Sequence, residues 1–457
     1  MIPSALIYLG VMLVFIILWF SLLKRPIYEA LFLSFILLVA LTGTWTNIWT
    51  YIDGALSTSL LFSMIVFVAM SQLLSYTKII DSCIYLMLSL FGRIRGGAGY
   101  ASIIASSFMG ALSGSGPGNV MATGVITIPS MKKSGFPPEL AANVESVSSY
   151  MGNMIPPSSN IVGALGAYTA YCAATGKVLD VTSGQFWVIL WGIALYFIIQ
   201  RIVMLWGFCR YYKVQPMAKE DIPSIKETFR KGWKGLLLPL IILLPFVFDS
   251  IFSETFITAR LGAAGAKAFS KSLLFFIAGL AAIYAVMIVK DKKSVSIKKL
   301  INLFSSKAKS LVGPIVACTF GYMIGELFAD IGATAQLEEF LNELRLPLVG
   351  LALLIPLVTA FLGMIIPGSS QVVIFGPVFI STFAAAGANP LFVAAMLPCI
   401  CGTMCGITPP LALGMYAGMS IAESDFKKTL INDLWWVGAQ YILEVILLLG
   451  VLPILGL

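Results

Sequence analysis

The sequence predicts an all-α membrane protein that crosses the bilayer many times and is built from two inverted repeats. Apolar residues make up 59% of its 457 residues, charged residues only 11%, and the mean hydropathy is +0.95. Soluble domains are about one quarter charged, so this chain has too few charges to cover a soluble surface. Apolar runs of about 17–25 residues recur along it, and each is long enough to cross roughly 30 Å of hydrocarbon as a helix. Polar breaks in these runs recur in the same order in both halves, which predicts the repeats.

The N-terminal segment, residues 1–55, is expected to form scaffold spans at 5–23 and 29–45. A secretory signal peptide carries its positive charge before the apolar core. Here Lys24 and Arg25 follow the first apolar run. We therefore expect an uncleaved span whose N-terminus lies outside the cell.

The first repeat is expected over residues 56–206 and opens with a span at 57–76. Its further parts are an arm at 79–95, a cytoplasm-facing hairpin at 98–131, a broken helix at 138–172 and a plain span at 185–206. The hairpin is interrupted by the Gly/Ser-rich run Ser113–Gly118, and the helix is interrupted by Pro156-Pro157.

Residues 207–310 are predicted to form two basic cytoplasmic loops and two linking spans, at about 235–248 and 272–289. Segment 207–234 holds seven Lys/Arg and three acidic residues, and segment 290–309 holds seven Lys and one acidic residue. Cytoplasmic loops carry such an excess of positive charge. The net charge of +8 therefore indicates topology, and no nucleic-acid partner is expected.

The second repeat, residues 311–457, follows the same order of parts. They are a span at 311–329, an amphipathic arm at 335–345, an outward-facing hairpin at 347–386 broken at Pro367–Gln371, a helix at 390–422 broken at Pro409-Pro410, and a final span at 432–455. In the first half Ser115 precedes Pro156 by 41 positions. In the second half Ser369 precedes Pro409 by 40.

The basic loops place the two repeats in opposite orientations. With both loops inside, the first hairpin opens to the cytoplasm, the second opens outward, and the C-terminus lies outside. Lys267 and Lys271 fall on the outer side in this arrangement and oppose the positive-inside bias.

The four polar breaks predict a binding site within the membrane. Proline inside a helix removes a backbone hydrogen bond at a cost of about 3 kcal/mol. An unpaired backbone group in hydrocarbon is costly unless it lines a cavity or holds an ion. Interrupted helices at a repeat interface are typical of transporters, where backbone carbonyls coordinate the cation and half-helix N-termini face the anion. The alternative interpretation is a set of kinked helices with Gly/Ser packing faces.

The breaks also carry neutral oxygen ligands, which suit a weakly held monovalent cation such as Na⁺ better than Zn²⁺ or Ca²⁺. These ligands are Ser113, Ser115, Asn119, Thr123, Ser158, Ser159, Asn160, Ser369, Ser370, Gln371 and Thr408. We expect the substrate to contact Ser115, Asn119, Ser158, Ser159, Asn160, Ser370, Gln371 and Thr408.

Glu145 is a carboxylate within the helix that leads to the first Pro-Pro break. An ionisable residue inside a membrane segment is a functional candidate. Two roles are open for it in transport, binding a cation or carrying a proton. The alternative is a structural carboxylate near the cytoplasmic end of its helix that faces water or a serine.

Enzymatic chemistry is not expected. The chain has no histidine, which removes the usual acid/base residue and the commonest transition-metal ligand. It has no GxxxxGK[ST] phosphate loop. Transport must therefore draw its energy from an ion gradient or an external partner, and no cofactor beyond the coupling ion Na⁺ is expected.

Several short motifs occur in a combination that is more specific than any one of them. They are LFGRIRGG at 90–97, MGALSGS at 109–115, IPSMKKSG at 128–135, IPPS at 155–158 and ITPP at 407–410. From about residue 60 to the C-terminus, the chain thereby resembles the large membrane subunit of tripartite ATP-independent periplasmic (TRAP) transporters, in the ion-transporter superfamily.

The resemblance implies an elevator-type importer of organic anions, coupled to sodium, in a bacterial or archaeal inner membrane. It implies a small four-helix membrane subunit and an extracytoplasmic substrate-binding protein as partners. Matching the motifs assigns sodium binding to Ser113, Gly114, Ser115, Asn119, Pro156, Pro157, Ser158, Gly368, Ser369, Ser370, Thr408 and Pro409. A stand-alone dicarboxylate or organic-anion carrier or exchanger without a binding protein is the alternative, and a membrane scaffold or channel is a third.

We predict that Pro156→Ala and Pro409→Ala each stabilise their helix locally but weaken sodium binding, because a continuous helix would pair the carbonyls that the break leaves for the ion. The measurement is the sodium dependence of transport. An equal dependence in variant and parent would contradict the proposed ion site.

Overall fold

The computed structural model describes most of the chain as helices and turns, without a strand among the described residues. The predicted all-α class is therefore confirmed. The described residues are 4–457 except 24, 26, 58–61, 63–65, 67–69, 71–72, 75, 78, 114–115, 157, 180, 290–294, 334–335, 337–338, 340–345, 364–367 and 409–411.

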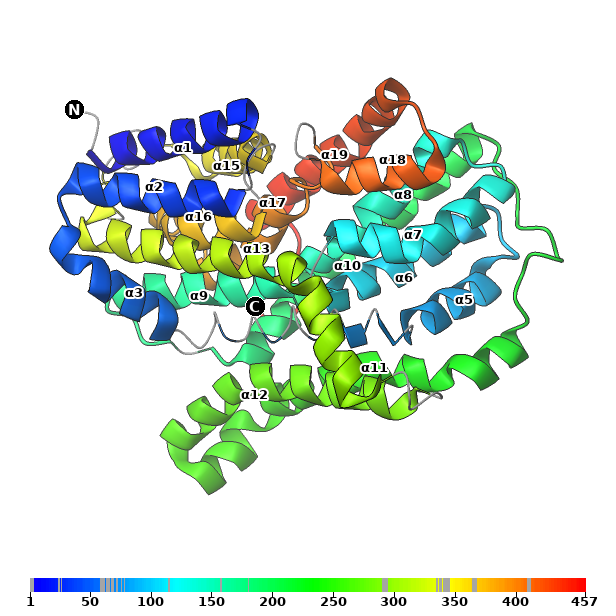
Figure 1. The fold of residues 1–457 in the computed structure, drawn as a ribbon, viewed down its shortest axis with the longest axis horizontal. Helices are drawn as coiled ribbons and strands as arrows, with labels where there is room; N and C mark the ends of the chain where they lie inside the picture. Colours follow the sequence, from blue (N-terminus) through cyan, green and yellow to red (C-terminus); the bar gives the residue numbers. More distant parts are fainter. Residues whose placement is uncertain are drawn as a thin grey trace.

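Helices follow one another along the described chain (Figure 1). The first are α1 (Ser4–Leu23), α2 (Ile27–Thr42), η1 (Trp45–Asn47), α3 (Ile48–Ser57), α5 (Ile79–Phe91), α6 (Gly97–Ser113), α7 (Gly116–Lys133), α8 (Pro138–Tyr150), η2 (Met151–Asn153), α9 (Ser159–Ala174) and α10 (Ser183–Tyr211). The remainder are α11 (Ile225–Phe252), η3 (Ser253–Ile257), α12 (Thr258–Ile288), α13 (Ile297–Asp330), α15 (Leu348–Gly363), α16 (Gly368–Ala385), α17 (Pro390–Gly402), α18 (Leu413–Ala422) and α19 (Phe426–Leu448).

Helix α10 is the one described helix long and apolar enough to cross a bilayer by itself. It begins with a capping box, in which Thr182 Oγ1 accepts from the Gln185 N–H and Gln185 Oε1 accepts from the Thr182 N–H. On its outer face, large apolar side chains are exposed at helical spacing: Leu195, Ile199, Val203 and Trp206. Such a stripe requires apolar surroundings, as expected for a lipid-facing helix.

Two hairpins and two interrupted helices occupy the segments where polar breaks were predicted. The hairpins are α6–α7 and α15–α16, and the interrupted helices are α8–α9 and α17–α18. Proline at the start of α8 and α17 is compatible with a helix, because N–H groups in the first turn make no hydrogen bond within the helix. The α9 start is capped by Ser158, whose Oγ accepts from the Asn160 N–H.

The two repeats pack against each other reciprocally. Helix α7 packs against α8 of its own repeat and α18 of the other, while α16 packs against α17 of its own repeat and α9 of the other. The first hairpin lies in the right half of Figure 1 with α8 and α18, and α16 lies in the left half with α9. This exchange of partners is the arrangement expected of two repeats related by a two-fold axis.

The remaining helices surround this pair of repeats. Helix α13 packs against α2, α3 and α16, and α11 packs against α5, α10 and α12. In Figure 1, α1, α2, α3 and α13 form one side of the molecule, and α11 and α12 project along another edge.

Some predicted boundaries differ from the structure. Helix α11 begins at Ile225 and α13 at Ile297, so both basic segments expected as loops are partly helical. The final helix covers Phe426–Leu448 instead of 432–455. The predicted arm at 335–345 and much of the predicted span at 57–76 lie outside the described residues. Helices can extend beyond the bilayer because charged turns are solvated there, which apolar periodicity alone does not reveal.

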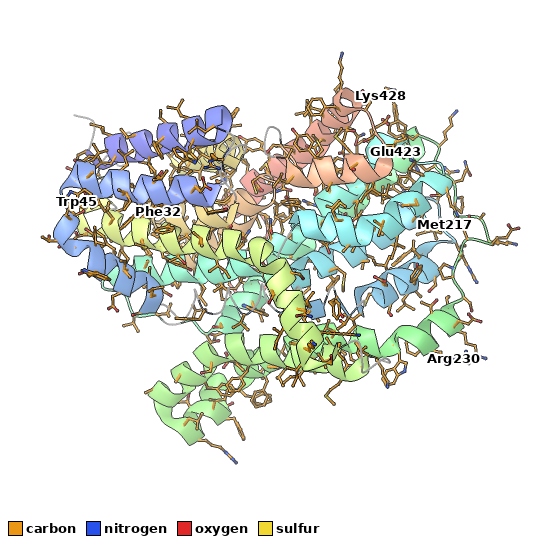
Figure 2. The ribbon with its side chains drawn as sticks, in the orientation of Figure 1. Phe32, Trp45, Met217, Arg230, Glu423 and Lys428 are labelled. Atoms are coloured by element: carbon orange, nitrogen blue, oxygen red, sulfur yellow. The ribbon has the colours of Figure 1, made fainter. Side chains whose placement is uncertain are left out.

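Three charged residues of the predicted cytoplasmic segments lie at one end of the molecule. Figure 2 shows Arg230, Glu423 and Lys428 at the end opposite Trp45. At this end Lys132 Nζ donates to the Ala422 carbonyl at 2.8 Å. This contact joins the open end of the first hairpin to the end of α18.

We predict that Ile193→Ala destabilises the protein by about 2–5 kcal/mol, because Ile193 is fully buried on the inner face of α10 and its removal leaves a cavity. Ile199→Ala, on the outer face of the same helix, is the matched control and should change stability by less than about 0.5 kcal/mol. Thermal unfolding in detergent measures both. Equal losses would contradict the assignment of the outer face.

Candidate transport site

The two helix breaks meet inside the fold. Asn153, in the turn that follows α8, donates its side-chain amide to the carbonyl of Gly402 at the end of α17, with Nδ2–O at 2.6 Å. Ser146 of α8 also donates its hydroxyl to the Gly414 carbonyl in α18 at 2.9 Å. The tertiary structure thus joins Asn153 and Gly402, which are 249 positions apart in the sequence.

Each hairpin packs onto the break of its own repeat through glycine. A Cβ added to Gly152, in the first break, would lie 2.0 Å from the carbonyl carbon of Gly110 in α6. A Cβ added to Gly368, at the start of α16, would lie 2.4 Å from the Cys401 carbonyl oxygen. Only glycine allows backbones to approach this closely.

Tyr150 lies where these segments come together. Its ring is the nearest neighbour of three glycines, and a Cβ on any of them would lie within 2.5 Å of a ring carbon. The glycines are Gly116 at the start of α7, Gly406 in the second break and Gly414 in α18. Tyr150 therefore connects the first hairpin to the second break.

Eight helix ends face this region. Helices α6, α8, α15 and α17 end there, and α7, α9, α16 and α18 begin there. Helix C-termini carry partial negative charge and N-termini partial positive charge. The helix ends therefore supply partial charges of both signs to this region.

The predicted residues of the first break lie at this meeting point. Ser158 Oγ donates to the Asn153 carbonyl at 3.2 Å while it caps α9. The side-chain nitrogen of Asn160 lies 2.6 Å from the position of a Cβ on Gly402. Pro156 is buried in the turn between α8 and α9, and α8 already ends at Tyr150, before the Pro-Pro pair.

Asn119, in the first hairpin, is fully buried in α7. Its Nδ2 donates to the Ser106 carbonyl and to Ser149 Oγ, both at 2.9 Å. Its Oδ1 is buried and has no hydrogen-bond partner among the described residues. This free oxygen is the clearest candidate ligand for a cation in the predicted set.

The second half contributes Gly368, Ser369, Gln371 and Thr408. Ser369 is half-buried and Gln371 fully buried near the start of α16. Thr408 Oγ1 donates to the Met404 carbonyl at 2.9 Å within the second break. Several break carbonyls therefore accept hydrogen bonds from the protein itself, so fewer are free for an ion than the Pro-Pro pairs alone predict.

Other predicted residues lie, entirely or in their side chains, outside the part of the chain that the structure describes. Gly114, Ser115, Pro157 and Pro409 lie outside the described residues, and the side chains of Ser113, Ser159 and Ser370 are likewise not described. Their roles stay predictions.

Glu145 is fully buried in α8. Five hydroxyl groups surround its carboxylate; the Ser102 hydroxyl lies at 2.7 Å, that of Thr127 at 2.5 Å and that of Ser149 at 3.0 Å. The full set is Ser102 and Ser106 from α6, Thr123 and Thr127 from α7, and Ser149 from α8. The serine contacts expected under the structural alternative are present, and the role of Glu145 in transport stays a prediction.

Sequence reasoning missed Asn153 and Arg201. Asn153 is an amide three residues before Pro156, and that proximity was the available signal. Arg201 lies within the segment expected as a plain span, yet it is buried and donates to Gln440 Oε1 at 2.6 Å. Gln440 in turn donates to Glu444 at 2.9 Å, so this network joins α10 to α19.

Comparison with known proteins decides the family. The profile described as "Tripartite ATP-independent periplasmic transporter, DctM component" matches residues 5–455. The chain belongs to this family. It is thus a transporter component of the membrane and not an enzyme, as the sequence predicted.

Two curated relatives of this TRAP subunit bear the name of a large permease protein. The C4-dicarboxylate TRAP transporter large permease protein DctM of Pseudomonas aeruginosa is 26% identical over 353 residues, which cover 76% of this chain and 74% of the relative. The 2,3-diketo-L-gulonate TRAP transporter large permease protein YiaN of Escherichia coli is 23% identical over 389 residues, covering 82% and 81%.

The fold of this TRAP subunit is also similar to a solved transporter structure. The antimetabolite efflux pump MtrF of Neisseria gonorrhoeae superimposes with a TM-score of 0.63 at 16% identity, covering 89% of this chain and 83% of that one. At this identity the similarity shows the fold alone.

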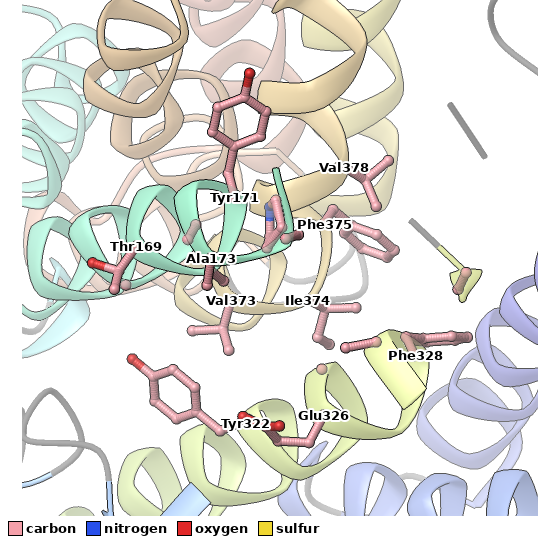
Figure 3. Close-up of a pocket in the computed structure, with 18 of the residues that line it drawn as sticks. Thr169, Tyr171, Ala173, Tyr322, Glu326, Phe328, Val373, Ile374, Phe375 and Val378 are labelled. Atoms are coloured by element: carbon pink, nitrogen blue, oxygen red, sulfur yellow. The ribbon is translucent and has the colours of Figure 1, made fainter. Parts of the chain in front are cut away.

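A cavity of about 440 Å³ lies apart from the helix breaks, between α9, α13 and α16. Figure 3 shows Tyr322 and Glu326 of α13 facing Val373 and Ile374 of α16. Its walls are mainly apolar, and among the described residues the lining includes the carboxylate of Glu326 but no Lys or Arg. Its chemistry does not suit a carboxylate ligand, and it borders the contact between α13 and α16.

We predict that Gly152→Ala destabilises this TRAP subunit by about 1–3 kcal/mol, because the added methyl would overlap the backbone of Gly110. Gly207→Ala in α10 is the control: a Cβ there meets no atom within 4 Å, and alanine favours the helix by up to about 1 kcal/mol. Thermal unfolding measures both. If Gly152→Ala were as stable as Gly207→Ala, the close approach of hairpin and break would be wrong.

Proposed function

We propose that this chain is the large permease subunit of a sodium-coupled transporter that imports a small organic anion. The observation that supports this is the convergence of two hairpins and two interrupted helices on one region. Discontinuous helices at a repeat interface bind the coupling ion and the substrate in secondary transporters. Four helix C-termini favour a cation there and four N-termini favour an anion.

The cation is proposed to bind on the side of the first hairpin and the first break. Asn119 presents a buried, unpaired oxygen there, and the C-terminal ends of α6 and α8 lie nearby. The remaining sodium ligands are proposed to come from the tips predicted by sequence. These are Ser113, Gly114, Ser115, Pro156, Ser158, Gly368, Ser369, Thr408 and Pro409.

The anion is proposed to bind at the N-termini of α9 and α18. Backbone N–H groups in a first helical turn lack intrahelical partners and bind anions. Asn160 and Thr408 flank this position. The named relatives handle C4-dicarboxylates and 2,3-diketo-L-gulonate, so we infer a small carboxylate with additional polar oxygens as the substrate.

The transport movement is proposed to be an elevator displacement. The hairpins and interrupted helices interlock through reciprocal packing and would move as one body. Helices α2, α3 and α13 would form the stationary side. The apolar cavity between α13 and the α9–α16 pair supports this division, because an incompletely packed, apolar interface can slide without breaking polar contacts.

The family implies two partners, a small four-helix membrane subunit and an extracytoplasmic binding protein that delivers the substrate. We propose that both act with this chain at the inner membrane, with the end that carries Arg230 and Lys428 on the cytoplasmic side.

We predict that proteoliposomes containing the permease complex take up a labelled dicarboxylate when an inward sodium gradient and the binding protein are both supplied. Replacing external sodium with choline should reduce uptake at least tenfold. Uptake unchanged without sodium would refute the coupling, and full uptake without the binding protein would favour a stand-alone carrier.

In the same assay Ser369→Trp should abolish uptake while expression is retained, because the half-buried Ser369 lies at the start of α16 beside the second break. Ser420→Trp, at an exposed position of α18, is the size-matched control and should transport normally. Normal uptake by Ser369→Trp would favour a scaffold or a channel over a carrier.

A further inference from the structure

Glu145 is a buried acidic residue without a positively charged partner among the described residues. Its side chain is fully buried. Arg25–Glu29 and Lys133–Asp221 are ion pairs of the described residues, and neither includes Glu145. Burying an uncompensated carboxylate is costly, so a protein that retains one needs either strong hydrogen bonding or a bound counter-charge.

The hydroxyl cage stabilises this charge. Three helices contribute residues spaced four apart: Ser102 and Ser106 in α6, Thr123 and Thr127 in α7, and Glu145 itself with Ser149 in α8. Residues four apart share one face of a helix, so each helix presents a pair toward the same point. Hydroxyl groups that donate to a carboxylate make short charge-assisted bonds, and the bonds from Ser102 and Thr127 measure 2.7 and 2.5 Å.

One member of the cage connects Glu145 to the candidate cation ligand. Ser149 has a single hydroxyl hydrogen and donates it to Glu145 Oε1 at 3.0 Å. Its oxygen therefore accepts the second contact, from Asn119 Nδ2 at 2.9 Å. The charge on Glu145 thereby sets the direction of the hydrogen bonds in this chain.

A second contact fixes the orientation of the Asn119 amide. Asn119 also lies 2.9 Å from the backbone carbonyl of Ser106, which can only accept a hydrogen bond. The nitrogen must face both Ser106 and Ser149, so Oδ1 points the other way. That oxygen is buried and has no partner among the described residues.

We propose that Glu145 is a positioning residue for the coupling cation. It orients Asn119 through Ser149 so that Asn119 Oδ1 is a cation ligand, and its charge compensates the cation without touching it. The inference rests on the proposed sodium coupling, and it explains why a site whose predicted ligands are neutral oxygens can hold a charged ion away from water. Coulomb attraction between unit charges is much stronger in the protein interior than in water, so a carboxylate one residue removed from the ligand still raises affinity.

The experiment measures binding of ²²Na⁺ to the purified permease complex without substrate. The parent should bind sodium saturably. Glu145→Gln should raise the dissociation constant at least tenfold, because it removes the charge while keeping the side-chain shape. Ser149→Ala keeps the charge and cuts the link to Asn119, and it should raise the constant by a smaller factor. Ser130→Ala is the control, since the Ser130 hydroxyl of α7 donates to the Ile126 carbonyl of its own helix and is not part of the cage, and its constant should match the parent.

A compensating variant separates a charge effect from a folding effect. Adding Asn119→Asp to Glu145→Gln returns a carboxylate to the same locus, so the double variant should recover at least part of the lost sodium affinity. If the role of Glu145 were purely structural, Glu145→Gln would lower the melting temperature and the double variant would not recover sodium affinity. If Glu145→Gln does not fold, Ser149→Ala decides the question. A higher dissociation constant for sodium at an unchanged melting temperature would support the proposal, and an unchanged constant would overturn it.

The outcomes distinguish the two proposals. A parent that binds no sodium would refute the proposed coupling. A parent that binds sodium while Glu145→Gln and Ser149→Ala bind it equally well would leave the coupling intact and overturn the role of Glu145. Uptake by the parent that is driven by a proton gradient and is independent of sodium would refute both proposals together, because the carboxylate would then be a proton carrier.

Discussion

The structure depends on helices that end in the middle of the fold, where their terminal backbone groups form hydrogen bonds and contacts across the repeat interface. A helix end buried away from water has backbone groups that must be satisfied by something else. Here the carbonyl at the end of α17 accepts from Asn153 of the other repeat, and α9 begins with its own serine cap. Glycines allow the backbones to come close enough for this exchange.

The same constraint explains why the site can be polar inside an apolar protein. The helix ends at the centre carry partial charges, and the side chains around them are mostly hydroxyls and amides whose bonds are made within the fold. Asn119 Oδ1 differs: it has no hydrogen-bond partner among the described residues, although its side-chain nitrogen donates to both Ser106 and Ser149. A buried hydrogen-bond acceptor without a partner, next to groups that are all hydrogen-bonded, indicates a binding position for a ligand.

Much of this could be predicted from the sequence, although individual contacts could not. The hairpins, the interruptions and the family followed from apolar runs, Gly/Pro positions and short motifs. The cage around Glu145 has a sequence signal, since hydroxyl residues four apart occur in α6 and α7, but nothing in one helix shows which neighbour it faces. The buried Arg201 was missed because a plain apolar run conceals one charged residue whose partner, Gln440, is 239 positions away.

The sequence by itself determined that this protein is an all-α membrane transporter component with two matched sets of interrupted helices, because hydropathy and proline act locally on each segment. Only the tertiary structure decided that Tyr150 contacts both the first hairpin and the second break, that Asn153 bonds Gly402, and that Asn119 turns its oxygen away from Ser106. These are contacts between distant segments, and their directions depend on how the helices cross, which no local pattern encodes.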